Sequence, residues 1–178
     1  MENKKISKYL SLILRHQPQL INLELDSHGW ADTNTLILNT KKYTLTPELI
    51  YDLVRGNDKQ RFAISDDGKK IRANQGHSIQ IDLDLTAIQP PKVLYHGTAS
   101  RFLQSIHAKG LLKGERHHVH LTESADTARM VGSRYGSAVI LTIDSELMHQ
   151  QGAQFYKTKN DVWLVEYVPA DKIVNNDT

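Results

Sequence analysis

Residues 66–78 of the chain read DDGKKIRANQGHS, and the neighbouring segments are arranged around this stretch. It opens with Asp-Asp-Gly, which is typical of a turn, because Asp bonds nearby backbone and Gly adopts a positive φ at no steric cost. The turn separates a short β-type run at residues 62–65 from a second run that begins near Ile71. The stretch therefore predicts a β-hairpin.

The residues after this hairpin are almost all hydrogen-bonding groups, with one Gly that allows the backbone to approach a ligand closely. A polar loop is the simplest interpretation of such a segment. However, two other dense polar segments occur in the chain, LRHQP at residues 14–18 and ERHHVHL at residues 115–121. Three such clusters in 178 residues predict a binding site for an anion.

Upstream of the hairpin, the apolar spacing and capping residues predict three helices, over residues 6–15, 33–38 and 47–55. Pro18 ends the first helix, because the residue before a proline disfavours the helical conformation. Thr46 followed by Pro47 is a strong helix start, with a capping hydroxyl before a proline at the first helical position. Three helices followed by a hairpin is the order of a winged helix-turn-helix, a fold that often binds nucleic acid.

Adjacent prolines in residues 83–92, LDLTAIQPPK, predict a linker to a second lobe of different pattern. The expected strands lie at residues 93–95, 119–121, 139–143, 155–156 and within 162–168, and helices follow Phe102 and Ser124. We therefore predict an α+β fold, with a winged-helix-like lobe over residues 1–88 and a lobe with a mainly antiparallel sheet over residues 93–178.

Composition narrows the classes of function. The net charge of +2 excludes a bulk polycation, so any phosphate binding must come from local clusters. The chain has no Cys, which excludes disulfides, thiolate nucleophiles and Cys-ligated zinc. The apolar stretch near the N-terminus is too short to span a bilayer and lacks a cleavage-site pattern. We expect a cytoplasmic monomer without membrane association.

Several common catalytic motifs are missing. GxGxxG, GxxxxGK[ST] and GxSxG do not occur, which argues against Rossmann dinucleotide sites, P-loop enzymes and common covalent hydrolases. His117, His118 and His120 lack the spacing of a known zinc frame, so we expect no metal.

The chain instead carries cationic side chains in pairs, namely Arg15-His16, Lys59 with Arg61, Arg72 with His77, and Arg116 with His117. The guanidinium group of Arg is a planar fork of donors that matches phosphate oxygens bidentately. Each pair alone is most simply a solvated surface charge. Together the pairs indicate a site for a dianionic phosphate monoester.

Six segments occur here in one order: LRHQP, NDKQRF, IRANQGHS, LYHGT, RHHVHL and FYKTKNDVWL. Together they closely resemble the RNA 2′-phosphotransferase family, over residues 7–168, and IRANQGHS is the most specific of them. The resemblance implies an N-terminal winged-helix-like lobe that binds RNA and a C-terminal ADP-ribosyltransferase-like lobe that binds NAD.

The resemblance also implies a reaction, in which an internal RNA 2′-phosphate is passed to NAD. The phosphate attacks the ribose C1″ of NAD and nicotinamide leaves. The O2″ hydroxyl of the transferred ribose then attacks the phosphate. The products are RNA with a 2′-OH and ADP-ribose 1″,2″-cyclic phosphate. A spliced tRNA is one RNA that could carry such a phosphate.

The family's Arg-His-Arg-Arg set at the RNA phosphate matches Arg15, His16, Arg61 and Arg116. Arg134, in VGSRYGS, is an alternative for the last place or for an NAD phosphate contact. The resemblance assigns NAD binding to His96, Gly97, Thr98 and His120. Contacts to the RNA substrate are expected from Lys59, Arg72, Asn74, Gln75, His77 and Ser78.

Many ADP-ribosyltransferases carry a Glu on a late strand, and here the resemblance places Val162 at that position. This argues against the protein-modifying members of that class. Two alternatives remain open from the sequence. One is an ADP-ribosyltransferase that stops after the first step and caps terminal phosphates of nucleic acid. The other is a non-catalytic RNA-binding module.

Overall fold

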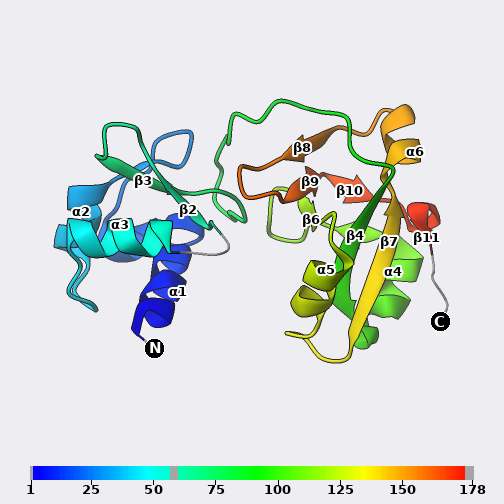
Figure 1. Ribbon diagram of the computed structural model, residues 1–178, viewed down its shortest axis with the longest axis horizontal. Coiled ribbons are helices and arrows are strands. Elements are labelled where there is room, and N and C mark those ends of the chain that lie inside the picture. Colours follow the sequence, from blue (N-terminus) through cyan, green and yellow to red (C-terminus); the bar gives the residue numbers. More distant parts are fainter. Residues whose placement is uncertain (1, 57–59, 175–178) are drawn as a thin grey trace. The chain divides into compact units, whose positions relative to one another are not determined.

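The structure, a computed structural model, describes residues 2–56 and 60–174 (Figure 1). The chain divides into two units, Met1–Asp84 and Leu85–Thr178. Each unit has its own hydrophobic core.

Unit 1 contains three helices, α1 (Glu2–Arg15), α2 (Thr33–Asn39) and α3 (Pro47–Arg55). The apolar residues of α1 (Ile6, Leu10, Ile13 and Leu14) are buried in the core of unit 1, as expected for an amphipathic helix that packs on a core. The carboxylate of Asp32 accepts a 2.7 Å hydrogen bond from the Thr35 N–H, and the hydroxyl of Thr46 caps α3 in the same way. The three predicted helices are confirmed.

A three-stranded antiparallel sheet completes unit 1. Its order is β1-β3-β2, from β1 (Ala31–Asp32), β2 (Phe62–Ile64) and β3 (Lys70–Ala73). The predicted hairpin is confirmed, and Gly68 has a φ of +74° in its turn. Ile71 pairs with both Ala31 and Ile64 and is fully buried, so β3 is the centre of the sheet. A short 3₁₀ helix, η1 (Pro18–Ile21), follows α1.

Unit 2 is built on two main three-stranded sheets. The first has the order β11-β7-β4, from β4 (Val93–Ala99), β7 (Ala138–Asp144) and β11 (Ile173–Val174). The second has the order β6-β9-β8, from β6 (Val119–Leu121), β8 (Phe155–Lys157) and β9 (Trp163–Val165). Reciprocal hydrogen bonds between Tyr95 and Thr122, of 2.8 and 2.9 Å, link the two sheets.

The remaining elements of unit 2 are the strand pair β5 (Leu111–Leu112) and β10 (Tyr167–Val168), and the helices η2 (Ser100–Phe102), α4 (Leu103–Lys109), α5 (Ala125–Gly132), α6 (Ser145–Gln150) and η3 (Ala170–Lys172). All strand pairs in the described residues are antiparallel, and the α+β class is confirmed. Within these residues, no helix has both the length and the apolar content needed to cross a membrane.

Unit 2 differs from the prediction in several details, and the short strands β5 and β11 were not predicted. The strand predicted at residues 93–95 continues to Ala99, because Gly97 and Thr98 pair with Ile140 and Val139 of β7. The single strand expected within residues 162–168 is two strands, β9 and β10. The exposed Glu166 separates them, and they pair in different sheets. Helix α6, which Asp144 caps through a 3.0 Å bond to the Leu147 N–H, was not predicted.

Candidate functional site

In unit 1 the end of α1 is bonded to the residues that follow β3. The backbone N–H of Ser78 donates to the carbonyl of Arg15 at 3.0 Å. The side chains of His16 and Ser78 share a 2.9 Å hydrogen bond between Nδ1 and Oγ. Two of the polar segments singled out in the sequence, 62 residues apart at these positions, therefore meet in one place.

Arg61 joins this cluster through its backbone. Its carbonyl accepts a 2.9 Å hydrogen bond from the N–H of Asn74, and the Asn74 side chain donates to the carbonyl of Gln60 at 2.5 Å. The guanidinium of Arg61 donates to the hydroxyl of Ser7 on α1 at 3.5 Å. The residues after β3 thus connect the end of α1 to the strand that follows Arg61.

Arg72 lies over the ring of Trp30, with its guanidinium carbon 4.6 Å from the ring centroid. Burial lowers the pKa of Arg72, and the carboxylates of Asp26 and Asp84 partly oppose this shift. Among the described residues, Arg72 Nε and Gln75 Oε1 are buried and have no hydrogen-bond partner. Such atoms cost free energy unless a ligand or water satisfies them, so they are typical of a binding site.

The other predicted substrate residues are placed as follows. His77 is buried, with 2% exposure, and Gly76 before it has a φ of +85°, a conformation that Gly adopts without strain. Lys59 lies outside the described residues. Of the predicted substrate set, the structure therefore brings Asn74 and Ser78 into direct contact with the Arg-His segments.

Ser7 and Trp30 were not recognised from the sequence. Ser7 lies on the buried face of α1 between Ile6 and Leu10, and a polar residue inside an apolar stripe was the signal that could have revealed it. Trp30 follows a turn in which the Asp26 carboxylate accepts from the backbone N–H groups of His28 and Trp30. No local signal identifies its partner Arg72, which is 42 positions later.

In unit 2, His96 on β4 is bonded to His120 on β6. The Nδ1–H of His96 donates to the carbonyl of His120 at 2.9 Å, and a carbonyl can only accept. Burial lowers the pKa of His96, the charge of Arg116 adds to this shift, and the bond to His120 opposes it. His96 is therefore neutral near pH 7, with the lone pair of Nε2 available as an acceptor.

Arg116 contacts the second of these histidines, His120. One of its guanidinium nitrogens donates to Nδ1 of His120 at 3.3 Å. In the neutral ring, Nε2 of His120 then carries the proton and is a donor. Arg116 belongs to unit 2, whereas Arg15, His16 and Arg61 belong to unit 1.

Gly97 and Thr98 pack against α5. A Cβ atom on Gly97 would lie 1.7 Å from the carbonyl oxygen of Ala128, and one on Gly132 would lie 2.5 Å from that of Thr98. Both glycines are therefore required by the close approach of α5 to β4. An NAD contact by Gly97 or by the buried Thr98 stays a prediction.

Arg134 follows α5 as an exposed residue, and its side chain makes no hydrogen bond or ion pair with any residue of the described ranges. Val162 precedes β9 and exchanges hydrogen bonds with Thr158. The β9 residue in register with His120 is Leu164. Strand β9 itself, Trp-Leu-Val, carries no carboxylate. Within residues 2–56 and 60–174, no group of three or more His, Asp or Glu side chains is placed to hold a metal ion.

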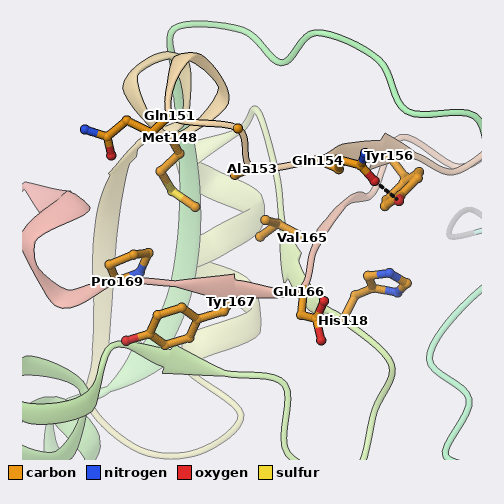
Figure 2. A pocket seen from close by; sticks show the side chains of 11 residues that line it. His118, Met148, Gln151, Ala153, Gln154, Tyr156, Val165, Glu166, Tyr167 and Pro169 are labelled. Carbon is orange, nitrogen blue, oxygen red and sulfur yellow. Dashed lines mark hydrogen bonds between the residues drawn. The ribbon is translucent and has the colours of Figure 1, made fainter.

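Unit 2 also contains an open pocket of about 610 Å³ (Figure 2). His118 and Tyr156 lie at one end, Tyr167 and Pro169 at the other, and Val165 lies between them. None of the residues predicted to bind NAD lines it.

Comparisons with known proteins identify one family. The model of a family described as "RNA 2'-phosphotransferase, Tpt1 / KptA family" matches residues 1–167. A probable RNA 2′-phosphotransferase of Pseudomonas fluorescens is 56% identical over 166 residues, 92% of this chain and 91% of that protein. Proteins of the same description from Acaryochloris marina and Hahella chejuensis are 51% and 48% identical, and cover 96% and 98% of this chain and 96% and 95% of their own lengths. The chain belongs to the RNA 2′-phosphotransferase, Tpt1 / KptA family.

Proposed function

We propose that this chain removes an internal 2′-phosphate from RNA by passing it to NAD. The two steps are ADP-ribosylation of the phosphate with loss of nicotinamide, and transesterification that leaves a 2′-OH. The observation that carries the proposal is the joining of Arg15, His16, Arg61, Asn74 and Ser78 by hydrogen bonds in unit 1, in a member of this family.

The arginines of this cluster suit a dianionic phosphate. A phosphate monoester is already a nucleophile near pH 7, so the first step requires positioning and charge neutralisation and needs no general base. The guanidinium groups of Arg15 and Arg61 supply planar donor forks for this purpose. Asn74 fixes the backbone of Arg61 through the 2.9 Å bond to its carbonyl.

His16 is assigned to the proton of the second step. A hydroxyl that attacks phosphorus must lose its proton, and imidazole is suited to that transfer near neutral pH. The 2.9 Å bond between Nδ1 of His16 and Oγ of Ser78 fixes the orientation of the ring. The arginines stabilise the added charge on the phosphorus in the transition state.

The residues of β4 and β6 fit NAD. When bound, NAD supplies the electrophilic ribose carbon C1″ and nicotinamide as the leaving group. His96 presents a neutral acceptor at Nε2, which suits a ribose hydroxyl, and Arg116 orients the ring of His120 through Nδ1. Leu164 of β9, which pairs with His120, and Val162 just before β9 carry no carboxylate. This favours a phosphate acceptor over the protein acceptors of Glu-dependent enzymes.

The experiment mixes the protein with NAD and a short RNA that bears one internal 2′-phosphate. Mass spectrometry follows the RNA and nicotinamide together, and the same RNA without the phosphate is the control. Loss of phosphate with stoichiometric nicotinamide is the expected result. A stable RNA-phosphate-ADP-ribose adduct would instead identify an enzyme that stops after the first step. No change in either species would leave an RNA-binding module and overturn the proposal.

A further inference from the structure

The pocket of unit 2 has the side-chain chemistry of a site for a planar ring. The rings of His118 and Tyr156 meet edge to face, with centroids 5.5 Å apart and an angle of 62° between their planes. This arrangement leaves ring surface available for a further stack. At the opposite end, the hydroxyl of Tyr167 donates to the carbonyl of Lys109 at 2.9 Å, which holds a ring that is 41% exposed (Figure 2).

The charges of the pocket disfavour a phosphate ligand. No Lys or Arg lines it, and Glu166 contributes a carboxylate. The hydrogen bond from Lys113, 2.8 Å away, lowers the pKa of Glu166, so this carboxylate is ionised near neutral pH. Burial lowers the pKa of His118, with the neighbouring His117 and Lys113 acting in the same direction, so this ring is neutral. The pocket thus suits an uncharged ligand.

Polar groups at the rim can bind the edge of such a ring. The Tyr156 hydroxyl donates to Oε1 of Gln154 at 2.9 Å, which leaves the amide N–H₂ group of Gln154 to donate elsewhere. The apolar surface between the aromatic ends comes from Met148 and Val165 (Figure 2). A mostly apolar floor with a few polar groups is the usual composition of a small-molecule site.

We propose that this pocket binds an unpaired nucleobase of the RNA that carries the 2′-phosphate. The assignment rests on the proposed function for the identity of the RNA. Stacking on aromatic side chains is the usual way in which proteins hold unpaired bases. The adenine of NAD is the other source of the same chemistry, and it is disfavoured because His96 and His120 do not line the pocket.

The test compares Tyr156→Leu, which removes the ring, with Tyr156→Phe, which keeps the ring and removes the bond to Gln154. Equilibrium binding of a fluorescent 2′-phosphorylated RNA is measured without NAD, so the result does not depend on turnover. We expect Tyr156→Leu to weaken RNA binding about tenfold, the scale of one stacked base, and Tyr156→Phe to stay within about twofold of wild type. Circular dichroism checks that both variants fold.

A matched set of RNAs lacks the base at one position of the RNA at a time. At one position, removal of the base should weaken binding to the wild type by the same factor and have no further effect on Tyr156→Leu. If, at every position, the loss of affinity from removing the base multiplies with the loss from Tyr156→Leu, the proposal is wrong. So does unchanged RNA binding by Tyr156→Leu together with a raised KM for NAD, which would place adenine in the pocket.

Two further arms do not depend on the folding of the Tyr156 variants. In Glu166→Gln the exposed carboxylate is neutralised, and RNA binding should be unchanged or stronger at low salt; weaker binding would contradict a site that holds an uncharged base by stacking. With 4-thiouridine at the position that the abasic set identifies, the wild type should crosslink in a peptide that contains Tyr156 or Tyr167. Crosslinks confined to Met1–Asp84 would contradict the assignment. Base-dependent binding without nicotinamide release would reject the proposed function and retain the pocket.

Discussion

At the scale of single residues, the carbonyl of His120 determines which nitrogen of His96 carries the proton. The 2.9 Å bond places that proton on Nδ1, and burial lowers the pKa of the ring. The unfolded chain lacks both effects, so His96 there protonates near the ordinary value of about 6.5. Folding stability is therefore linked to pH at this position.

The sign of this linkage follows from which state binds the proton. Below about pH 6.5 the unfolded chain takes up a proton on His96 while the folded chain does not, so the free energy of unfolding falls as the pH is lowered from 7 towards 5. Well above pH 6.5 neither the folded nor the unfolded chain binds this proton, so His96 no longer makes the free energy of unfolding depend on pH. Urea unfolding at several pH values should show a shallower fall for His96→Asn, whose amide N–H can still donate to His120. Equal slopes for the variant and the wild type would contradict this.

Gly97 gives a prediction for stability. In Gly97→Ala the new methyl would lie 1.7 Å from the backbone oxygen of Ala128, so α5 must move, and we expect a loss of about 3 kcal/mol in the free energy of unfolding. Gly114→Ala is the matched control, because Gly114 has a φ of +61° but no heavy atom within 4 Å of the added methyl. It should cost about 1 kcal/mol for the backbone strain alone. Thermal and denaturant unfolding measure both, and similar losses would refute the role of close packing.

At the scale of elements, Glu123 ties the connection between β6 and α5 to the β8–β9 hairpin. Its carboxylate accepts from Nε1 of the buried Trp163 at 2.8 Å and from Lys157 at 2.9 Å. These two hydrogen bonds lower the pKa of Glu123. The strand that carries His120 is therefore held at its end by a side chain just beyond it.

The two bonds of Glu123 can be separated by mutation. Glu123→Ala leaves the indole N–H of Trp163 without its acceptor and should cost about 1–3 kcal/mol of unfolding free energy. Glu123→Gln keeps an oxygen for Trp163 and loses only the exposed ion pair, so its cost should be below about 1 kcal/mol. Denaturant unfolding compares the two. Equal losses for the two variants would show that the ion pair, which both of them remove, is the important contact.

The elements show how far sequence reasoning reaches. Helix α3 and the hairpin were predicted because their signals, Thr46 with Pro47 and the turn at Gly68, lie within a few residues of the structure that they cause. The predicted end of β4 was too early, because the true end depends on pairing with β7, about 40 positions away. The bond between His16 and Ser78 is likewise non-local, so family resemblance suggested a shared site and only the structure gave the contact.

At the scale of the whole molecule, the proposed phosphate-binding residues Arg15, His16 and Arg61 and the proposed NAD residues belong to different units. Arg61→Ala should therefore lower 2′-phosphate transfer by about 10²-fold or more while leaving NAD affinity largely intact. Arg55→Ala, which removes an exposed arginine at the end of α3, is the control and should change neither. Calorimetric titration with NAD and single-turnover transfer give the two readouts. Equal loss of both by Arg61→Ala would refute the division of roles.

The small net charge leads to a prediction for salt. Because the net charge of the chain is only +2, RNA binding should depend on the local cationic cluster and release few counterions. The logarithm of the affinity should therefore fall with the logarithm of the salt concentration with a slope of about 2. Arg61→Ala should reduce that slope by about 0.7, and Arg55→Ala should leave it unchanged. Fluorescence anisotropy at several salt concentrations measures it. A much steeper slope would indicate a broad cationic surface.

The chain has two tryptophans, and each unit contains one, Trp30 beneath Arg72 and Trp163 beside Glu123. Each half of the molecule therefore carries its own intrinsic optical probe. A Trp→Phe change at either position leaves emission from one half alone, so the melting of the two halves can be recorded separately in the intact chain. Coincident transitions would show that the halves unfold as one cooperative body. Separate transitions would show that one half can open while the other keeps its ligand.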